Sequence, residues 1–252
     1  MKSIIIRLIV ALVGVFFVLK VVDAASCADY KSTNLPCTEI PMCSSTAKSS
    51  IGITQLSNGF GLATSSSSAQ FCHTKDALHI DVLSTGQKYL GAPNQFETCN
   101  DSVFNMDVVE LFIAPHSDQP VKCYSEIDTS PYGPIFESRI YSPNLNHTGI
   151  VGTLIDCGIS GITTKTSIAT DKSWQWHVSV PWSLINDASW CPASVPANTL
   201  NVYRGNLYRV NELKQVGSSC SSSTCEYMAW SPTLANPPAF HEPTKFGFFV
   251  LV

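Results

Sequence analysis

Four carboxylates stand on segments that the sequence predicts to be short strands or the loops between them: Glu110, Glu126, Asp128 and Glu242. Enzymes that hydrolyse glycosidic bonds need two such groups facing one cleft at a defined separation. No sequence pattern pairs any two of these four, and a binding domain without catalysis would explain the same residues. The sequence also contains no serine nucleophile elbow, P-loop or dinucleotide-binding fingerprint. We therefore expect a protein that is not an enzyme.

Glu110 lies in the segment 107–114, DVVELFIA, whose side chains alternate between two faces as in a strand. The alternation places Glu110 on one face with Val108 and Phe112. An isolated charge on a strand face needs water, an opposite charge or a ligand. Glu110 is therefore an exposed rim residue, a ligand contact, or the partner of one of three arginines: Arg139, Arg204 and Arg209.

His241, which follows Phe240, has a side chain suited to three different roles. It could hydrogen-bond the backbone of its loop, contact a ligand, or bind a metal or haem iron. A haem site would need axial ligands such as Met and His facing one pocket. The further candidates for such a site are Met106, Met228 and His177, and no C-x-x-C-H attachment motif is present.

Residues 1–24 are typical of a secretory signal peptide. Lys2 and Arg7 form a basic start, residues 8–19 form an apolar run, and residues 22–24 supply a cleavage site. Because the apolar run is shorter than the ~20 residues of a membrane span, we favour a cleaved signal over an N-terminal anchor. We expect a secreted protein with no membrane span after cleavage.

All ten cysteines follow this N-terminal segment, and an even number in a secreted chain predicts disulfides rather than metal ligands. No C-x-x-C pair and no Cys/His group with zinc spacing is present. Cys220 and Cys225 flank a serine-rich stretch and could form a local bridge. Cys99 and Cys123 could tie the two ends of one strand to its neighbours, and the other pairings stay open.

Charge and sequons bear on the partners of the protein. Three basic residues and one acidic residue lie in 1–24, so the rest of the chain carries a net charge of −6 against −4 for the whole. Without a basic stripe, we expect no nucleic-acid partner. Charged residues are only 13% of the chain, which favours a ligand bound by hydrogen bonds and stacking over one bound by ion pairs. Sequons at Asn100 and Asn146 fit a glycosylated, exported protein.

Short strands separated by turn residues must position these side chains. We expect strands at 78–82, 107–114, 174–180, 200–210 and 246–252, a hairpin of 124–128 with 135–141, a short helix at 181–185, and a loop at the serine run 65–68. Large apolar side chains alternate in 174–180, as in a core strand. The sequence predicts an all-β protein, a single antiparallel β-sandwich of jelly-roll or immunoglobulin-like type stapled by disulfides.

Five blocks resemble, in order, those of family 9 carbohydrate-binding modules and their relatives: 104–112, 124–133 (YSEIDTSPYG), 174–182 (WQWHVSVPW), 204–210 (RGNLYRV), and 230–247 with its W-S-P and F-H-x-P-x-x-F-G. The resemblance covers residues 75–252 and implies a β-sandwich related to the DOMON group, whose members bind sugars or haem. Residues 25–74 would form a cysteine-rich N-terminal segment and the first strands of the sandwich.

The resemblance also implies a sugar site clamped between two aromatic rings. The family's two clamping tryptophans correspond to Phe104 and Phe240 here, and Glu110 matches the carboxylate that binds sugar hydroxyls. The family's sugar-binding arginine has no match near 124–128. A phenylalanine can still stack on the C–H face of a sugar, with less area than a tryptophan. Core packing of both rings is the alternative, and the resemblance favours the loop role for His241.

From these observations we expect a secreted, non-catalytic protein that binds a sugar or glycan end. The expected ligand-binding residues are Phe104, Glu110 and Phe240, with Asn206, Arg209 and His241 as further candidates. No cofactor is required, and calcium, which family 9 modules often bind, is possible without an assigned site. Two alternatives stay open: an extracellular structural or assembly protein with an unused pocket, and a DOMON-like haem domain.

Overall fold

The computed structural model describes residues 5–6, 21–22, 25–93, 95–118, 120–216 and 219–252. Most of the expected signal peptide, residues 1–24, lies outside the described residues. Of that segment the structure describes strands β1 (Ile5–Ile6) and β2 (Val21–Val22), which form a two-stranded antiparallel sheet. No helix in the described part of the chain is long and apolar enough to cross a membrane.

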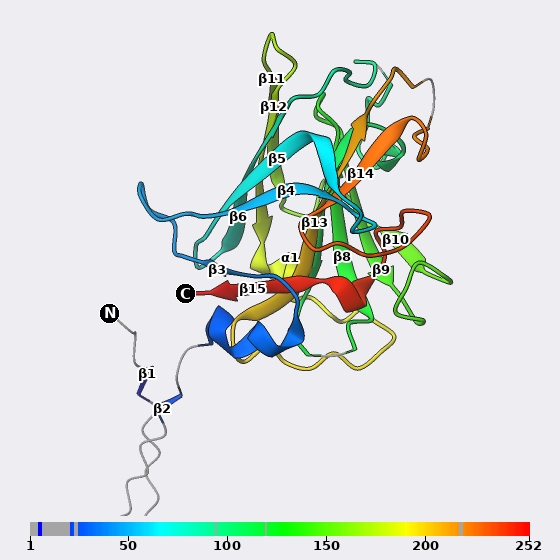
Figure 1. Ribbon diagram of the computed structural model, residues 1–252. Coiled ribbons are helices and arrows are strands. Elements are labelled where there is room, and N and C mark those ends of the chain that lie inside the picture. Colours follow the sequence, from blue (N-terminus) through cyan, green and yellow to red (C-terminus); the bar gives the residue numbers. More distant parts are fainter. Residues whose placement is uncertain (1–4, 7–20, 23–24, 94, 119, 217–218) are drawn as a thin grey trace, which may run out of the picture.

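The other strands belong to one large sheet (Figure 1). They are β3 (Cys37–Ile40), β4 (Ser49–Leu56), β5 (Leu62–His73), β6 (Ala77–Thr85), β7 (Val108–Ala114), β8 (Cys123–Thr129), β9 (Ile135–Tyr141), β10 (Val151–Leu154), β11 (Thr163–Ile168), β12 (Trp174–Pro181), β13 (Val202–Glu212), β14 (Cys225–Ala229) and β15 (Gly247–Leu251). The helices are η1 (Cys27–Thr33), η2 (Val103–Asn105), α1 (Trp182–Asn186) and η3 (Pro243–Lys245).

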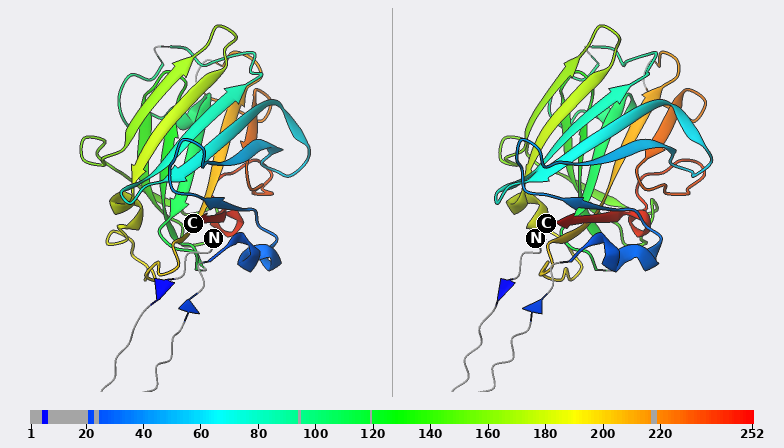
Figure 2. Two further views of the ribbon diagram at one scale, coloured as in Figure 1. Left: turned by 90° about the vertical axis from the view of Figure 1, so that its left-hand side faces the viewer. Right: turned by 60° about the vertical axis from the view of Figure 1, so that its left-hand side comes forward.

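Within this sheet the strand order is β10-β9-β8-β7-β13-β14-β4-β5-β6-β12-β11, and each neighbouring pair is antiparallel. Strand β15 adds to β13 antiparallel and to β3 parallel. The sheet curls, so that the arm containing β7, β8 and β13 faces the arm containing β4, β5, β6 and β12 (Figure 2). One buried cluster fills the space between the arms, with members from both: Leu111, Ile127, Leu207, Ile53, Phe71, Ile80, Trp174 and Trp176.

The expectation of an all-β, antiparallel, disulfide-linked protein is confirmed, with the strands in one continuous curled sheet. The predicted strands at 78–82, 107–114, 174–180 and 200–210 correspond to β6, β7, β12 and β13, and the final run forms the buried strand β15. The predicted hairpin is β8 with β9, and helix α1 follows β12 as expected.

The serine run 65–68 is a strand, so the predicted loop was wrong. Ser65 and Ser67 point inward from β5 and are buried. The Ser67 hydroxyl lies 2.8 Å from the Ser84 hydroxyl of β6, and the Ser65 hydroxyl donates to the sulfur of Met228 at 3.5 Å. Small polar side chains that hydrogen-bond across a sheet are stable inside it, and this pairing is not visible in the composition of the run.

Five disulfides join the ten cysteines, so the expected disulfide framework is confirmed. The pairs are Cys27–Cys37, Cys43–Cys72, Cys99–Cys157, Cys123–Cys191 and Cys220–Cys225. The local bridge of Cys220 with Cys225 is the one that the spacing predicted. Cys99 and Cys123 bond to partners in separate segments, which fixes both flanks of β7 to neighbouring loops.

Strand β13 is buried along its whole length and is shared by the two arms. One edge pairs with β7, while the other edge pairs with β15 at Val202–Gly205 and with β14 at Tyr208–Glu212. Gly205 lies close to where the partner strand changes. A Cβ atom at this position would lie 2.5 Å from the Phe249 ring and 2.6 Å from the carbonyl oxygen of Phe112.

Replacing Gly205 by alanine should therefore destabilise the protein. We expect G205A to lower the free energy of unfolding by about 1–3 kcal/mol, the usual cost of overpacking a core, measured by urea denaturation. The matched control is G52A in β4, where a Cβ atom would meet only the Thr54 methyl group at an ordinary 3.8 Å. Equal midpoints for the two variants would contradict the close approach at Gly205.

Candidate functional site

The site is built on the face of β7, β8 and β13 that turns away from the core. Phe112 packs on this face with its ring centroid 5.5 Å from Tyr124 and 5.1 Å from Tyr208. Phe246, from the segment before β15, packs edge-on to Phe112 at 6.2 Å. These rings belong to a second buried cluster, separate from the one between the arms, and they hold the surrounding backbone in place.

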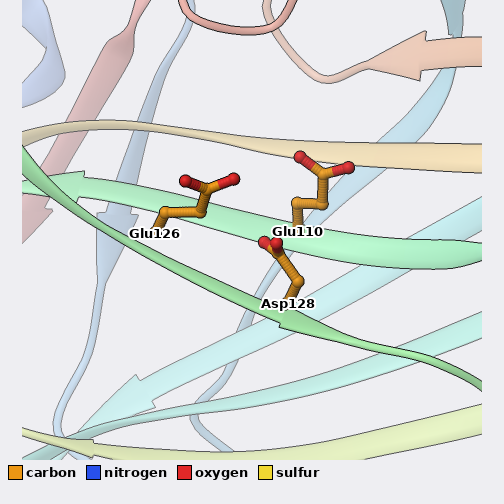
Figure 3. Close-up of side chains that lie close together, drawn as sticks. All are labelled: Glu110, Glu126 and Asp128. Atoms are coloured by element: carbon orange, nitrogen blue, oxygen red, sulfur yellow. The ribbon is translucent and has the colours of Figure 1, made fainter. Parts of the chain in front are cut away.

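Strand pairing brings three carboxylates together on the same face. Glu110 of β7 lies directly opposite Asp128 of β8, and Glu126 is two residues earlier on β8. Their exposed fractions are 3% for Glu110, 5% for Glu126 and 0% for Asp128. One carboxylate oxygen from each residue lies within 4.8 Å of those of the other two, and Figure 3 shows the three groups clustered on adjacent strands.

Burial and mutual repulsion make this acidic cluster hard to ionise. Burial raises the pKa of Glu126 to about 8, and burial together with the charge of Glu126 raises the pKa of Glu110 well above its usual range. The pKa of Asp128 is raised in the same way, by burial and then by both glutamates. Protons or a cation must offset so much negative charge in a buried space.

Glu110 is neither the exposed rim residue nor the arginine partner that the sequence left open. It is buried, and its charged neighbours are the other two acids. The three arginines considered for it bond elsewhere: Arg139 to Asp187 and Arg209 to Asp107, each at 2.5 Å, and Arg204 to the carbonyl oxygen of Phe246. The expectation that remains for Glu110 is contact with a ligand.

A pocket of about 420 Å³ opens onto the acidic cluster. Glu110 and Glu126 line it, whereas Asp128 is not one of its lining residues and lies against the two glutamates. The remaining walls are mainly rings and aliphatic side chains: Phe104, Phe136, Tyr227, Phe240, His241, Ile140, Ile150 and Leu154. Apolar walls with a few converging polar groups are typical of small-molecule sites.

Phe104 and Phe240, the two expected clamp residues, both line this pocket. Phe104 on η2 is 38% exposed and packs edge-on against Phe136 at 5.0 Å, so one side of its ring is available to a ligand. Phe240 is only 8% exposed because it stacks on Tyr208, with ring centroids 4.2 Å apart. Phe104 is therefore an open wall, and Phe240 combines core packing with a small exposed surface.

His241 lines the pocket beside Glu126. Its Nδ1 shares a hydrogen bond of 2.8 Å with the Tyr124 hydroxyl, and its Nε2 lies 4.0 Å from a carboxylate oxygen of Glu126. Burial lowers the pKa of His241 to about 4, so the ring is neutral at neutral pH. His241 was expected to hydrogen-bond the backbone of its own loop. The structure instead pairs it with the side chain of Tyr124 on β8.

Two expected ligand contacts, Asn206 and Arg209, are not brought to the pocket. Asn206 is fully buried and bonds the neighbouring segment: its amide donates to the carbonyl of Ser231 at 2.7 Å and accepts from the Ser231 N–H at 3.0 Å. Arg209 points to the opposite face of β13, where it pairs with Asp107 and lies over the Trp174 ring. The structure therefore does not place these two side chains in the pocket, because they pack and bond inside the protein.

The candidate haem ligands lie in different surroundings. Met228 belongs to the core between the arms, and Met106 is buried with 1% exposure. His177 is on β12, where its Nδ1 bonds Asp81 at 2.6 Å. Of the four candidates, His241 alone lines the pocket described above, so the structure does not favour the haem alternative.

Glu126, Asp128 and Tyr227 complete the site, although the sequence did not select them as ligand contacts. The two acids were considered only as catalytic carboxylates. Their signal was the period of two within 124–128, which puts Glu126 and Asp128 on one face of the predicted strand. That pattern says nothing about which strand lies alongside, and so it could not connect them with Glu110.

The likeness to one solved structure agrees with this picture at the level of fold. No protein-family profile and no curated protein matches the sequence. A solved structure from Bacteroides uniformis, described as a "putative carbohydrate-binding protein", aligns with 86% of this chain and 99% of its own at 16% identity and a TM-score of 0.61. Two structures of a family 9 carbohydrate-binding module from Caldicellulosiruptor kristjanssonii, with cellotriose and with glucose, align with 86% of this chain at 11% and 12% identity, covering 93% and 96% of their own, both with a TM-score of 0.47.

We predict that Asn206 acts in stability. The variant N206A leaves the buried Ser231 N–H and carbonyl without partners, which costs about 1–3 kcal/mol of unfolding free energy. The matched control is N198A. Asn198 likewise bonds both the N–H and the carbonyl of one residue, Val202, but its side chain is only partly buried. Water can therefore take the place of the Asn198 amide in that variant. A urea midpoint for N206A equal to that of N198A would contradict the structural role.

Proposed function

We propose that this chain is a secreted, non-catalytic carbohydrate-binding protein that takes a sugar or glycan end into the pocket beside Phe104. The observation that carries the proposal is the meeting of a partly exposed aromatic ring with buried carboxylates in one pocket of about 420 Å³. Sugars present both kinds of surface, because the C–H face of a pyranose stacks on rings and its hydroxyls donate to carboxylates.

Phe104 and Phe240 would contact the sugar to different extents, because their rings differ in exposure. Phe104 offers the larger free surface and would make the main stacking contact, while Phe240 would contact the sugar along a small surface. Glu110 and Glu126 would receive the hydroxyls, and neutral His241 would contribute a polar edge. The likeness in fold to a protein described as a putative carbohydrate-binding protein supports the same class of ligand.

Secretion and glycosylation form part of this proposal. Five disulfides are consistent with an oxidising compartment.

The asparagine side chains of the two sequons differ in their hydrogen bonds. The Asn100 nitrogen donates to the carbonyl of Ile155 at 2.7 Å and its oxygen accepts from the Glu137 N–H at 2.8 Å. At Asn146 only the oxygen is engaged in a described bond, by the Thr148 N–H and hydroxyl.

A prediction from the proposed function concerns binding. Calorimetric titration of sugars chosen from a glycan panel should show that F104A binds at least about tenfold more weakly than the wild type, equivalent to about 1.4 kcal/mol. Because Phe104 is partly exposed, the variant should fold normally. F60A is the matched control, since Phe60 is 78% exposed and does not line the pocket. Unchanged binding by F104A would contradict the stacking role, and no binder in the panel would favour the assembly-protein alternative.

Another prediction concerns glycan attachment. When the chain is expressed in a eukaryotic secretory system, peptide mass spectrometry should find the glycan at Asn146 and little at Asn100, since a glycan at Asn100 would compete with its bond to Ile155. The variant N146Q should lose most of the glycan mass, whereas N100Q should not. Full occupancy at Asn100 in folded protein would contradict the described bonds.

A further inference from the structure

Asp128 is the most deeply buried member of the acidic cluster, and its carboxylate has no hydrogen-bond donor among the described residues. The side chain has no exposure, and neither carboxylate oxygen accepts a hydrogen bond from an N–H or hydroxyl group of the described residues. Its polar neighbours are the carboxylates of Glu110 and Glu126. A buried carboxylate in this position is stable only when a proton or a cation joins it to those neighbours.

We propose that Glu110, Glu126 and Asp128 form a binding site for a hard divalent cation, with Ca²⁺ as the best fit, at the inner end of the pocket. Carboxylate oxygens are the preferred ligands of Ca²⁺, which holds them at about 2.3–2.6 Å, so two ligands of one ion lie no more than about 5 Å apart. The three oxygens here lie within 4.8 Å of one another. The all-oxygen set disfavours zinc, which prefers nitrogen and sulfur.

A cation explains the cluster better than the two competing occupants. A shared proton can join Glu126 to Asp128, but Glu110 must then be neutralised separately, whereas one divalent ion can contact all three groups. An organic ammonium group would enter from the pocket, which Glu110 and Glu126 line and Asp128 does not. A bare ion can lie between all three groups because it carries no attached carbon. It would also offset two of their three charges without an arginine or lysine.

The position of the site gives the cation a second role, which rests on the proposed carbohydrate function. Three carboxylates supply part of the six to eight oxygens that Ca²⁺ takes. The open coordination positions would point toward the pocket, on the side where Glu110 and Glu126 line it. Neighbouring hydroxyls of a sugar stacked on Phe104 could fill these positions. The acids would then bind the sugar through the ion rather than directly.

The test is calorimetric titration of CaCl₂ into chelator-treated full-length protein, with MgCl₂ as comparison. We expect one Ca²⁺ per chain, a rise in melting temperature on adding Ca²⁺, and at least tenfold weaker binding in D128N and in E126Q. The matched control is E137Q, because Glu137 is a buried acid of the neighbouring strand β9 outside the cluster. Circular dichroism and the metal-free melting temperature of each variant show whether it folds.

Several outcomes would overturn the cation site. They are the absence of Ca²⁺ binding and of a melting shift in the wild type, equal binding by wild type and folded D128N, or binding of glucosamine without any binding of Ca²⁺. Glycan titrations with and without chelator separate this inference from the proposed function. Glycan binding that survives chelation overturns the bridging role alone, and a wild type that binds Ca²⁺ but no glycan overturns the carbohydrate function while supporting the cation site.

Discussion

Strand β13 has more hydrogen-bonded partners than one strand usually takes, and this constraint shapes the whole molecule. One edge of β13 pairs with β7. The opposite edge pairs with β15 along its first part and with β14 along its last part, so the sheet branches at β13. The strands that continue from β14 form the second arm, which curls over the first. Gly205 makes the division possible because the Phe249 ring occupies the space of a side chain.

The same strands carry both the core and the site, because alternate side chains point to opposite faces. In β7, Leu111 packs between the arms, whereas Glu110 and Phe112 belong to the outer face. The core side around Leu111 is mainly apolar, and its burial offsets the free-energy cost of burying acids on the other side. The aromatic cluster around Phe112 then keeps the outer face rigid, so the carboxylates stay close together despite their repulsion.

The differences between the sequence-based expectations and the structure come from contacts between segments. Arg209 was expected at the ligand, but its position in β13 turns it toward the core, where Asp107 offsets its charge. Asn206 lies on β13 too and is taken up by bonds to Ser231. The serines of 65–68 are polar enough for a loop, yet hydroxyl pairing with β6 makes them a strand. In each case the deciding partner is distant in the chain.

The sequence alone was enough to predict the β class, seven of the thirteen strands of the large sheet and the disulfide content. Its resemblance to family 9 modules pointed to Phe104, Glu110 and Phe240, which line the pocket. The strands follow from local patterns, since periods of two and turn residues act over a few positions. The three-dimensional arrangement was needed to show that Glu126 and Asp128 lie beside Glu110 and that Phe240 is mostly buried. The physical reason is register: which residues face each other across two strands depends on packing by the whole sheet.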